Sequence, residues 1–298
     1  MKLVTFRHEG RVSFGVVEGG AIVDLAPKFP GVLHLRALLA ALGSDLVRRV
    51  KAALPAAPRI DASSVTLLAP IPNPSKYLAL GGNYRAHRAE SASAAQADKF
   101  GQIWFNKQVT CVVGPNSAIL HPAITSQLDY EGELGIVIGV RCRNVSAANA
   151  RSVIAGYLVC NDVSMRDWQA KAPTHTLGKS HDTHGPIGPW LVTADEIGDP
   201  HALSLETRVN GEIRQNASTA DMVARVEDII AELSAACTLE PGDILATGTP
   251  AGVGKGFDPP RFLRVGDVVS VTIERLGTLE NRVADDTSPT VSPLPVYS

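Results

Sequence analysis

Residues 128–140, LDYEGELGIVIGV, place three carboxylates at alternate positions ahead of an uninterrupted apolar run. Side chains two residues apart in a β-strand point to the same face, so Asp129, Glu131 and Glu133 are predicted to line one side of a strand. The apolar run that follows is typical of a strand buried on both faces. This stretch therefore predicts a strand at the heart of a β-rich fold that carries acidic groups into the interior.

Carboxylates packed this closely need a cation, because like charges a few Å apart do not all remain ionised. Oxygen-only ligation favours Mg²⁺, Mn²⁺ or Ca²⁺ over zinc. Asp162, in the segment NDVSMRDWQ of residues 161–169, is a candidate to complete a metal site with Glu131 and Glu133. The alternatives are a sheet edge with its acids in water and, for Asp162, a helix N-cap. We favour the metal site because the strand turns fully apolar directly afterwards.

Composition bounds the class of protein. The chain has 298 residues, of which 45% are hydrophobic, and a net charge of −2. These values predict a globular protein without a nucleic-acid partner and without affinity for an anionic membrane surface. No apolar run approaches the roughly 18 residues that span a bilayer, and the amino terminus alternates like a strand rather than a signal peptide. The four cysteines form no CxxC pair, so we expect free thiols and a cytoplasmic location.

Two domains are expected. Residues 1–70 are predicted to form a small α+β domain, and residues 71–298 a larger domain of mixed or antiparallel β structure. The boundary falls at the proline-rich stretch APIPNPSK, residues 69–76. An Asn-Gly pair at 210–211 predicts a hairpin turn. Strands are predicted at residues 3–6, 14–17, 21–25, 77–80, 135–140, 156–160, 190–192, 205–209 and 268–273, and helices at 33–54 and 218–239.

His87 and Glu90 lie three residues apart in GNYRAHRAE, residues 82–90. On a helix they would share a face, where the carboxylate could orient the imidazole as a general base that activates water. The alternative is a surface His–Glu pair of the kind that helices carry by chance. The small polar residues at 91–100, SASAAQADKF, are predicted to form a mobile lid.

Two further segments carry candidate groups. In GKSHDTH, residues 178–184, Lys179 could neutralise an oxyanion or hold a substrate carboxylate. His181 and His184 could be ligands or simply exposed loop residues. The glycine loop at 248–255 lacks the Walker spacing, which argues against a nucleotide site. Its backbone N–H groups and the Thr249 hydroxyl are predicted to bind a small anion.

Together these motifs resemble the fumarylacetoacetate hydrolase family, from residue 76 to about 283. Residues 1–70 resemble the small domain of its longer members. The resemblance implies a mixed β-roll, barrel-like core, a homodimer and Mg²⁺ or Mn²⁺ in the active site. The motifs that carry it are GNYRAHRAE, LDYEGELGIVIG, NDVSMRDWQ, GKSHDTHGPIGPW, VNGEIRQ and PGDILATGTPAGVG.

The resemblance also implies roles for individual residues. Glu131, Glu133 and Asp162 become the metal ligands, while Asp129 stands outside the ligand set. His87 and Glu90 would activate water, and Lys179 would lie beside the metal. Arg166 and Gln169 would lie near the substrate, and Thr249 would contact its carboxylate. Gly82, Gln108 and His184 depart from the residues usual in the family and are predicted to shape the pocket.

The implied activity is metal-dependent hydrolysis of a C–C bond in a 2,4-dioxo acid such as an acylpyruvate. His87 would deprotonate the attacking water, and the metal and Lys179 would stabilise the departing pyruvate-like enolate. Decarboxylation of oxaloacetate-like acids and isomerisation of 2-hydroxyhepta-2,4-diene-1,7-dioate-type substrates use the same enolate site and stay open. A non-catalytic binding protein for small dicarboxylates is a weaker alternative, because it does not need a water-activating pair.

Overall fold

The computed structural model describes residues 1–90 and 102–287, apart from the side chains of Ala89 and Glu90. The predicted lid at 91–100 therefore lies outside the described residues. Within them, no helix has the length and apolar character needed to cross a membrane. All four cysteines are described, and they are free thiols as predicted.

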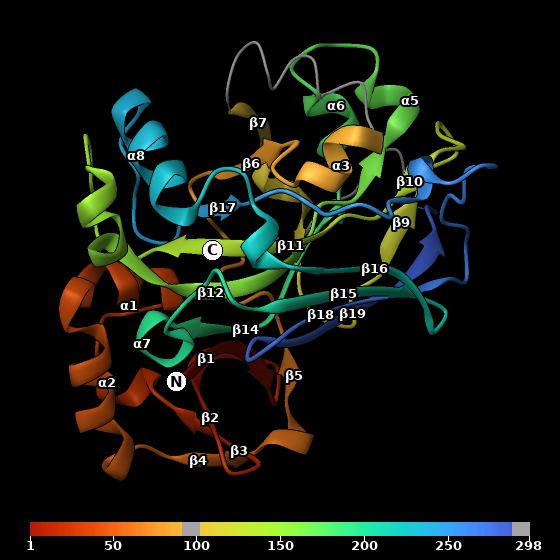
Figure 1. The fold of residues 1–298 in the computed structure, drawn as a ribbon. Coiled ribbons are helices and arrows are strands. Elements are labelled where there is room, and N and C mark those ends of the chain that lie inside the picture. Colours follow the sequence, from red (N-terminus) through yellow and green to blue (C-terminus); the bar gives the residue numbers. More distant parts are fainter. Residues whose placement is uncertain (91–101, 288–298) are drawn as a thin grey trace.

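One large sheet runs through the molecule (Figure 1) and, among the described residues, has 12 strands. Strand β11 lies in its interior, antiparallel to both β12 and β17. Strand β1 joins the amino-terminal strands to this sheet by pairing with β14, Leu3 opposite Leu191. In sheet order the strands are β4 (Arg59–Asp61), β3 (Ala21–Asp24), β2 (Arg11–Glu18), β1 (Lys2–His8), β14 (Gly185–Thr193), β12 (Ile154–Asn161), β11 (Gly132–Ile138), β17 (Ile244–Ala246), β6 (Tyr77–Gly81) and β7 (Ile103–Lys107), with β5 (Thr66–Leu67) beside β1 and β8 (Val112–Val113) beside β14.

A five-stranded sheet packs across strands β11, β12 and β14, and Val159, Leu205 and Val271 belong to the core between them. Its hairpin turns at Asn210 and Gly211, whose φ angles of 52° and 80° confirm the predicted Asn-Gly turn. The strands are β16 (Glu212–Ser218), β15 (Ser204–Val209), β18 (Val268–Ile273), β19 (Gly277–Asp285) and β9 (Ile119–His121), and a separate pair consists of β10 (Leu128–Asp129) and β13 (Ser164–Met165).

The helices lie in two groups, with α1, α2, α7 and α8 on the left and α3, α5 and α6 at the upper right (Figure 1). Helices α1 and α2 bury Leu38 and Val50 against the amino-terminal strands, whereas α8 buries Ile229 and Ile230 in the other core. The helices are α1 (Leu35–Leu42), α2 (Leu46–Ala53), α3 (Arg85–Glu90), α5 (Arg166–Gln169), α6 (Thr176–Lys179), α7 (Ala194–Ile197) and α8 (Val226–Ala236). Short 3₁₀ turns occupy Ala26–Lys28, Gly43–Asp45, Leu54–Ala56, Ala62–Ser64, Val109–Cys111, Ala147–Val153, Thr219–Asp221 and Gly254–Gly256.

The predicted fold class, a β-rich α+β protein with a small amino-terminal domain, is confirmed, but two helix predictions were too long. The helix expected at 33–54 breaks at Gly43, whose φ of 49° is outside the helical range. The helix expected at 218–239 begins only at Val226, because Arg225 is extended. Residues 69–76 form no helix or strand, and we retain this stretch as the proposed domain boundary.

The acidic strand also differs from the prediction, because it is interrupted. Strand β10 ends at Asp129 and β11 begins at Gly132. At the break, the Glu131 N–H donates to the Asn161 side chain (3.1 Å) and the Glu131 carbonyl accepts from the Asp162 N–H (2.9 Å). These bonds replace the regular ladder and fix the Glu131 backbone against the end of β12.

Candidate metal centre and its pocket

The structure brings the three predicted ligands together. Glu131, Glu133 and Asp162 are buried, and each offers a carboxylate oxygen within 4.8 Å of the others. Glu133 lies near the start of β11 and Asp162 just beyond the end of β12. Antiparallel pairing of Gly132 with Asn161 sets these two strand ends side by side. The alternative of acids at a solvated sheet edge is wrong, since β11 has a neighbour on each side.

Buried lysine and arginine side chains form ion pairs with this carboxylate cluster. The Lys179 ammonium donates to Glu131 and to Asp162, at 2.7 Å each, and Arg166 pairs with Glu131. Lys107, at the end of β7, is fully buried and donates to Asp162 at 2.5 Å. Sequence reasoning did not assign Lys107 to the site. The available signal was a lysine in phase with Phe105 in a strand, because a lysine on a buried face requires a charged partner.

Asp129 stands outside the three-carboxylate group. Its carboxylate accepts N–H bonds from Tyr130 (2.9 Å), Gly254 (2.7 Å) and Lys255 (3.0 Å), and one from Arg166 Nε (2.8 Å). The Gly248 N–H likewise donates to Glu133, at 2.7 Å. The prediction that this glycine loop binds a small anion is wrong for these N–H groups, because they already hold the protein's own carboxylates.

The pKa values of Glu131 and Glu133 are shifted in opposite directions. Burial would raise the pKa of Glu131, but Lys179 and Arg166 hold that pKa well below the usual range. For Glu133, burial and repulsion from Asp162 and Glu131 raise the pKa well above the usual range. Its carboxylate forms no ion pair within the described part of the chain.

A hard divalent cation fits this arrangement. The ligands are all carboxylates, and each oxygen that accepts one hydrogen bond keeps a second lone pair for a metal. The cluster also needs positive charge. Together with its buried charged neighbours, the cluster has four acidic and three basic groups and therefore one formal negative charge. The acidic groups are Asp129, Glu131, Glu133 and Asp162, and the basic groups are Lys107, Arg166 and Lys179. A divalent ion would reverse that sign and leave the site with one formal positive charge.

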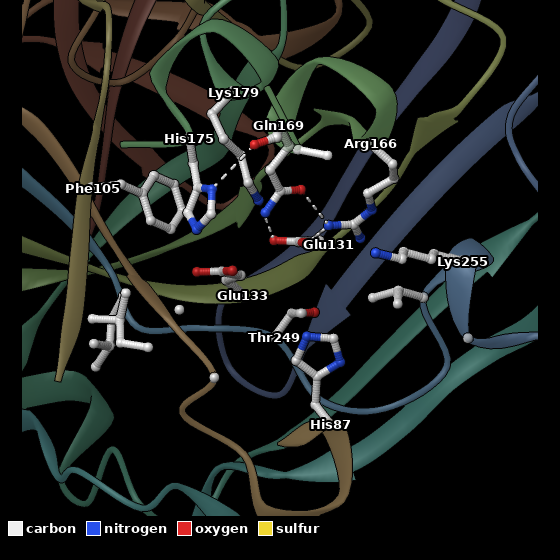
Figure 2. A pocket seen from close by; sticks show the side chains of 17 residues that line it. His87, Phe105, Glu131, Glu133, Arg166, Gln169, His175, Lys179, Thr249 and Lys255 are labelled. Atoms are coloured by element: carbon white, nitrogen blue, oxygen red, sulfur yellow. Dashed lines mark hydrogen bonds and ion pairs between the residues drawn. The ribbon is translucent and has the colours of Figure 1, made fainter. Parts of the chain in front are cut away.

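A cavity of about 270 Å³ opens beside Glu131 and Glu133 (Figure 2). His87, buried on α3, points its imidazole into this cavity from the side opposite Lys179 and His175. The segment that carries His87 and Glu90 is helical, which is the condition for the two side chains to share a face, but the Glu90 side chain lies outside the described residues. The predicted site residues that line the pocket are His87, Glu131, Glu133, Arg166, Gln169, Lys179 and Thr249.

Two of the predicted substrate contacts already have protein partners. The Thr249 hydroxyl donates to the Gly132 carbonyl (3.0 Å) and accepts from Gln215 (2.8 Å), so its proton is not available to a ligand. The Gln169 side-chain oxygen accepts from Arg166 at 3.1 Å, which leaves its amide N–H groups for a ligand. Both assignments stay predictions.

The histidine loop after Lys179 contributes less than predicted. His184 is buried with its ring bonded to the Leu120 carbonyl at 2.8 Å, and burial lowers its pKa to about 3. Neither His181 nor His184 lines the pocket or joins the carboxylate group. Of the three departures from the family, Gly82 lines the pocket, whereas Gln108 and His184 do not. The prediction that Gln108 and His184 shape the pocket is therefore wrong, whereas Gly82 does form part of its wall.

The pocket lining also includes Phe105, His175 and Lys255, to which the sequence analysis gave no role. His175 adopts a left-handed backbone with a φ of 57°, and its ring meets the edge of Phe105 with centroids 5.9 Å apart. No local pattern marks Phe105 or His175, because their approach to the cavity depends on contacts between distant segments, whereas Lys255 ends the glycine loop of residues 248–255.

Comparisons with known proteins agree with this architecture. A family model described as fumarylacetoacetate (FAA) hydrolase C-terminal matches residues 76–284, and one described as Rv2993c-like, N-terminal matches residues 1–70. Oxaloacetate tautomerase YisK of Bacillus subtilis is 46% identical over 74% of each chain. The mitochondrial oxaloacetate tautomerase fahd2 of Xenopus laevis is 40% identical over 95% of this chain and 90% of its own. A maleylpyruvate hydrolase from Sphingobium sp. SYK-6, solved with manganese(II) and pyruvate, is 32% identical over 96% of this chain and 99% of its own, with a TM-score of 0.79.

Proposed function

The chain belongs to the fumarylacetoacetate hydrolase family, and we propose that it interconverts the enol and keto forms of oxaloacetate or a close 2-oxo diacid, with Mg²⁺ or Mn²⁺ as cofactor. One observation carries the proposal. Glu131 and Glu133, two members of the buried three-carboxylate cluster, lie across one small pocket from the buried His87 imidazole (Figure 2). Two relatives with 46% and 40% identity are named oxaloacetate tautomerases, which supports this reaction among those of the family.

The reaction moves two protons. Ketonisation removes the proton from the hydroxyl on C2 of the enol and adds a proton at C3, and negative charge gathers on the C2 oxygen between these events. When bound, the metal ion supplies a Lewis acid that stabilises this charge. Glu131, Glu133 and Asp162 are the residues that would hold it.

Lys179 is placed to share that task. Two of the three N–H donors of its ammonium are committed to Glu131 and Asp162. The third remains for a ligand oxygen in the pocket that Lys179 lines. Because Lys179 is buried between two carboxylates, it stays charged, and its pKa is raised. It therefore acts as a fixed positive charge and hydrogen-bond donor, and not as the proton carrier.

His87 takes the role of proton carrier at C3. An imidazole can both accept and donate a proton, which a reversible tautomerase requires at a single position. Its ring enters the cavity from the side opposite the Glu131–Lys179 pair (Figure 2). A substrate bound between the two groups would therefore meet the oxyanion-stabilising groups on one side and the imidazole on the other.

A second candidate is hydrolysis of a C–C bond in a 2,4-dioxo acid. The same imidazole would then deprotonate a water molecule, with Glu90 as its partner, and the same groups would stabilise the pyruvate-like enolate that departs. The similarity to a maleylpyruvate hydrolase solved with manganese(II) and pyruvate supports this candidate.

The two candidates are separated by following substrate and product together. Loss of the enol absorbance of oxaloacetate is recorded with Mg²⁺, with Mn²⁺ and with EDTA, while a coupled assay detects pyruvate from oxaloacetate and from acetylpyruvate. Tautomerisation that is fast, EDTA-sensitive and lost in Glu131→Gln and His87→Ala, without pyruvate release, supports the first proposal. EDTA-sensitive cleavage of acetylpyruvate without accelerated tautomerisation would replace it by the second. Pyruvate from oxaloacetate alone would point to decarboxylation.

A further inference from the structure

Lys255 occupies an unusual position on the pocket wall. It lies in the 3₁₀ turn Gly254–Gly256, is exposed, and lines the cavity. Figure 2 shows its side chain extending toward Arg166 and Glu131. Among the lysine and arginine side chains that line the described pocket, it alone has no ion pair with a carboxylate, since Arg166 and Lys179 are both paired.

Local backbone constraints place Lys255 there. Gly252 has a φ of 99°, and a Cβ at this position would lie 2.0 Å from the Arg214 carbonyl oxygen. A Cβ on Gly254 would lie 2.6 Å from an Asp129 carboxylate oxygen. These two glycines let the loop lie directly against Asp129, which accepts the backbone N–H of Lys255. The lysine is therefore held beside the pocket by its own main chain, while its ammonium is left for other partners.

Arg166 supplies a second unused donor at the same place. Its Nε bonds to the Asp129 oxygen that also accepts the Lys255 N–H, so one carboxylate oxygen joins the two residues. Its Nη1 bonds to Glu131 and Gln169, whereas its Nη2 is buried without a hydrogen-bond partner among the described residues. A buried guanidinium nitrogen without a partner is costly, and a ligand oxygen would satisfy it.

We propose that the Lys255 ammonium and Arg166 Nη2 form a subsite for the second carboxylate of a diacid substrate. The inference rests on the proposed function and names the residues that would recognise the distal carboxylate of its 2-oxo diacid substrate. A divalent ion gives the carboxylate cluster one net positive charge, which balances the first carboxylate of the substrate. The second carboxylate then needs a cation of its own, and Lys255 provides it.

The side of the cavity away from Lys255 is apolar, which bears on how uncharged distal groups would bind. Figure 2 shows Phe105 on the side of the cavity away from Lys255, and Ile103, two residues before Phe105 on β7, also lines the cavity. An uncharged distal group gains nothing from an ammonium and would contact this apolar wall instead. Removal of the Lys255 charge should therefore affect diacids and spare monoacids.

Binding to the Mg²⁺-loaded protein tests this without relying on turnover. Isothermal titration calorimetry compares N-oxalylglycine, a stable 2-oxo diacid analogue, with oxamate, which keeps the chelating half and lacks the second carboxylate. Lys255→Met should weaken N-oxalylglycine binding about five- to tenfold, the range of a partly exposed charged contact, and change oxamate binding less than about twofold. Lys255→Arg should retain most of the N-oxalylglycine affinity. Lys171→Met is the control, since Lys171 is an exposed lysine outside the pocket.

The outcomes separate this inference from the proposed function. Equal losses for both ligands in Lys255→Met, or no loss for either, would overturn the subsite. A selective loss for the diacid supports it even if the wild-type protein fails to tautomerise oxaloacetate, in which case only the reaction is wrong. If oxaloacetate is tautomerised but the diacid affinity is insensitive to Lys255, the reaction stands and the subsite does not.

Discussion

Glu131→Gln and Glu133→Gln should have opposite effects on the metal-free protein, although both remove a proposed metal ligand. Glu133 has no described cationic partner, and its pKa is raised by burial and by its carboxylate neighbours. A glutamine there keeps an oxygen for the Gly248 N–H and removes an uncompensated buried charge. We expect Glu133→Gln to raise the free energy of unfolding in EDTA by about 1–3 kcal/mol. Glu131→Gln leaves Lys179 and Arg166 short of a partner and should lower it by about 3–5 kcal/mol.

Added metal should remove the advantage of Glu133→Gln over the wild-type protein. At an Mn²⁺ concentration about 100 times its Kd, the wild-type protein should gain about 2.7 kcal/mol. For a chain of this size, with an unfolding entropy of about 2.1 cal/mol/K per residue, that corresponds to a rise in Tm of about 4 °C. Both variants should lose most of this gain because each lacks one ligand.

The assay is thermal unfolding in EDTA and in Mn²⁺ across a pH series. A carboxyl whose pKa is raised in the folded state binds more protons folded than unfolded, so the metal-free wild type should lose stability as the pH rises above the ordinary glutamate value of 4.5. Glu133→Gln should flatten that slope. A destabilised Glu133→Gln protein in EDTA, or one that keeps the full Mn²⁺ shift, would refute the reasoning.

Three other substitutions test the surroundings of the site. Lys107→Met should cost about 3–5 kcal/mol of unfolding free energy and weaken Mn²⁺ binding, because Asp162 loses a buried partner. Lys51→Met, which breaks an exposed pair with Asp195, should cost about 1 kcal/mol or less in the same denaturant titration. Gly252→Ala should lower the free energy of unfolding by about 3 kcal/mol, since this position combines a positive φ with a 2.0 Å approach of the added Cβ to a carbonyl oxygen. Gly211→Ala, with a φ of 80° and open space around the Cβ, should lower it by about 1 kcal/mol. Equal losses in the two variants would show that the steric contact at Gly252 does not matter. His184 is buried and its pKa is lowered to about 3, so as the pH falls the unfolded chain takes up a proton at this histidine before the folded protein does. The free energy of unfolding should therefore fall by about 2 kcal/mol between pH 6.5 and pH 5. An unchanged pH slope in His184→Gln would show that another group is responsible.

The sequence was sufficient for the acidic cluster because the rule involved is local. Alternation places Glu131 and Glu133 on one face wherever the backbone is extended, and even the break between β10 and β11 leaves both side chains at the site. Asp162 followed from the same reasoning, because an acid just beyond an apolar strand lies at the end of a sheet. The Asn-Gly hairpin is equally local, since its two residues tolerate positive φ angles.

The remainder required information that no local pattern contains. Lys107 and Asp162 are 55 residues apart in sequence, and only the strand order β6–β7 beside β17 and β11 brings them together. The glycine loop indicated an anion site, and the anions proved to be Asp129 and Glu133. A sequence pattern can show that N–H groups are presented, but it cannot show whether a ligand or the protein itself accepts them.

Joining the amino-terminal strands to the large sheet has a consequence for aggregation. Strand β1 covers β14 through Lys2 and Leu3, and β12 covers the other side of β14. A protein cut after the proline-rich stretch would present the Leu191–Val192 part of β14 as an open row of N–H and C=O groups flanked by buried apolar side chains. Such an edge pairs readily with another chain. We therefore expect the pairing of β1 with β14 to protect β14 from intermolecular strand pairing.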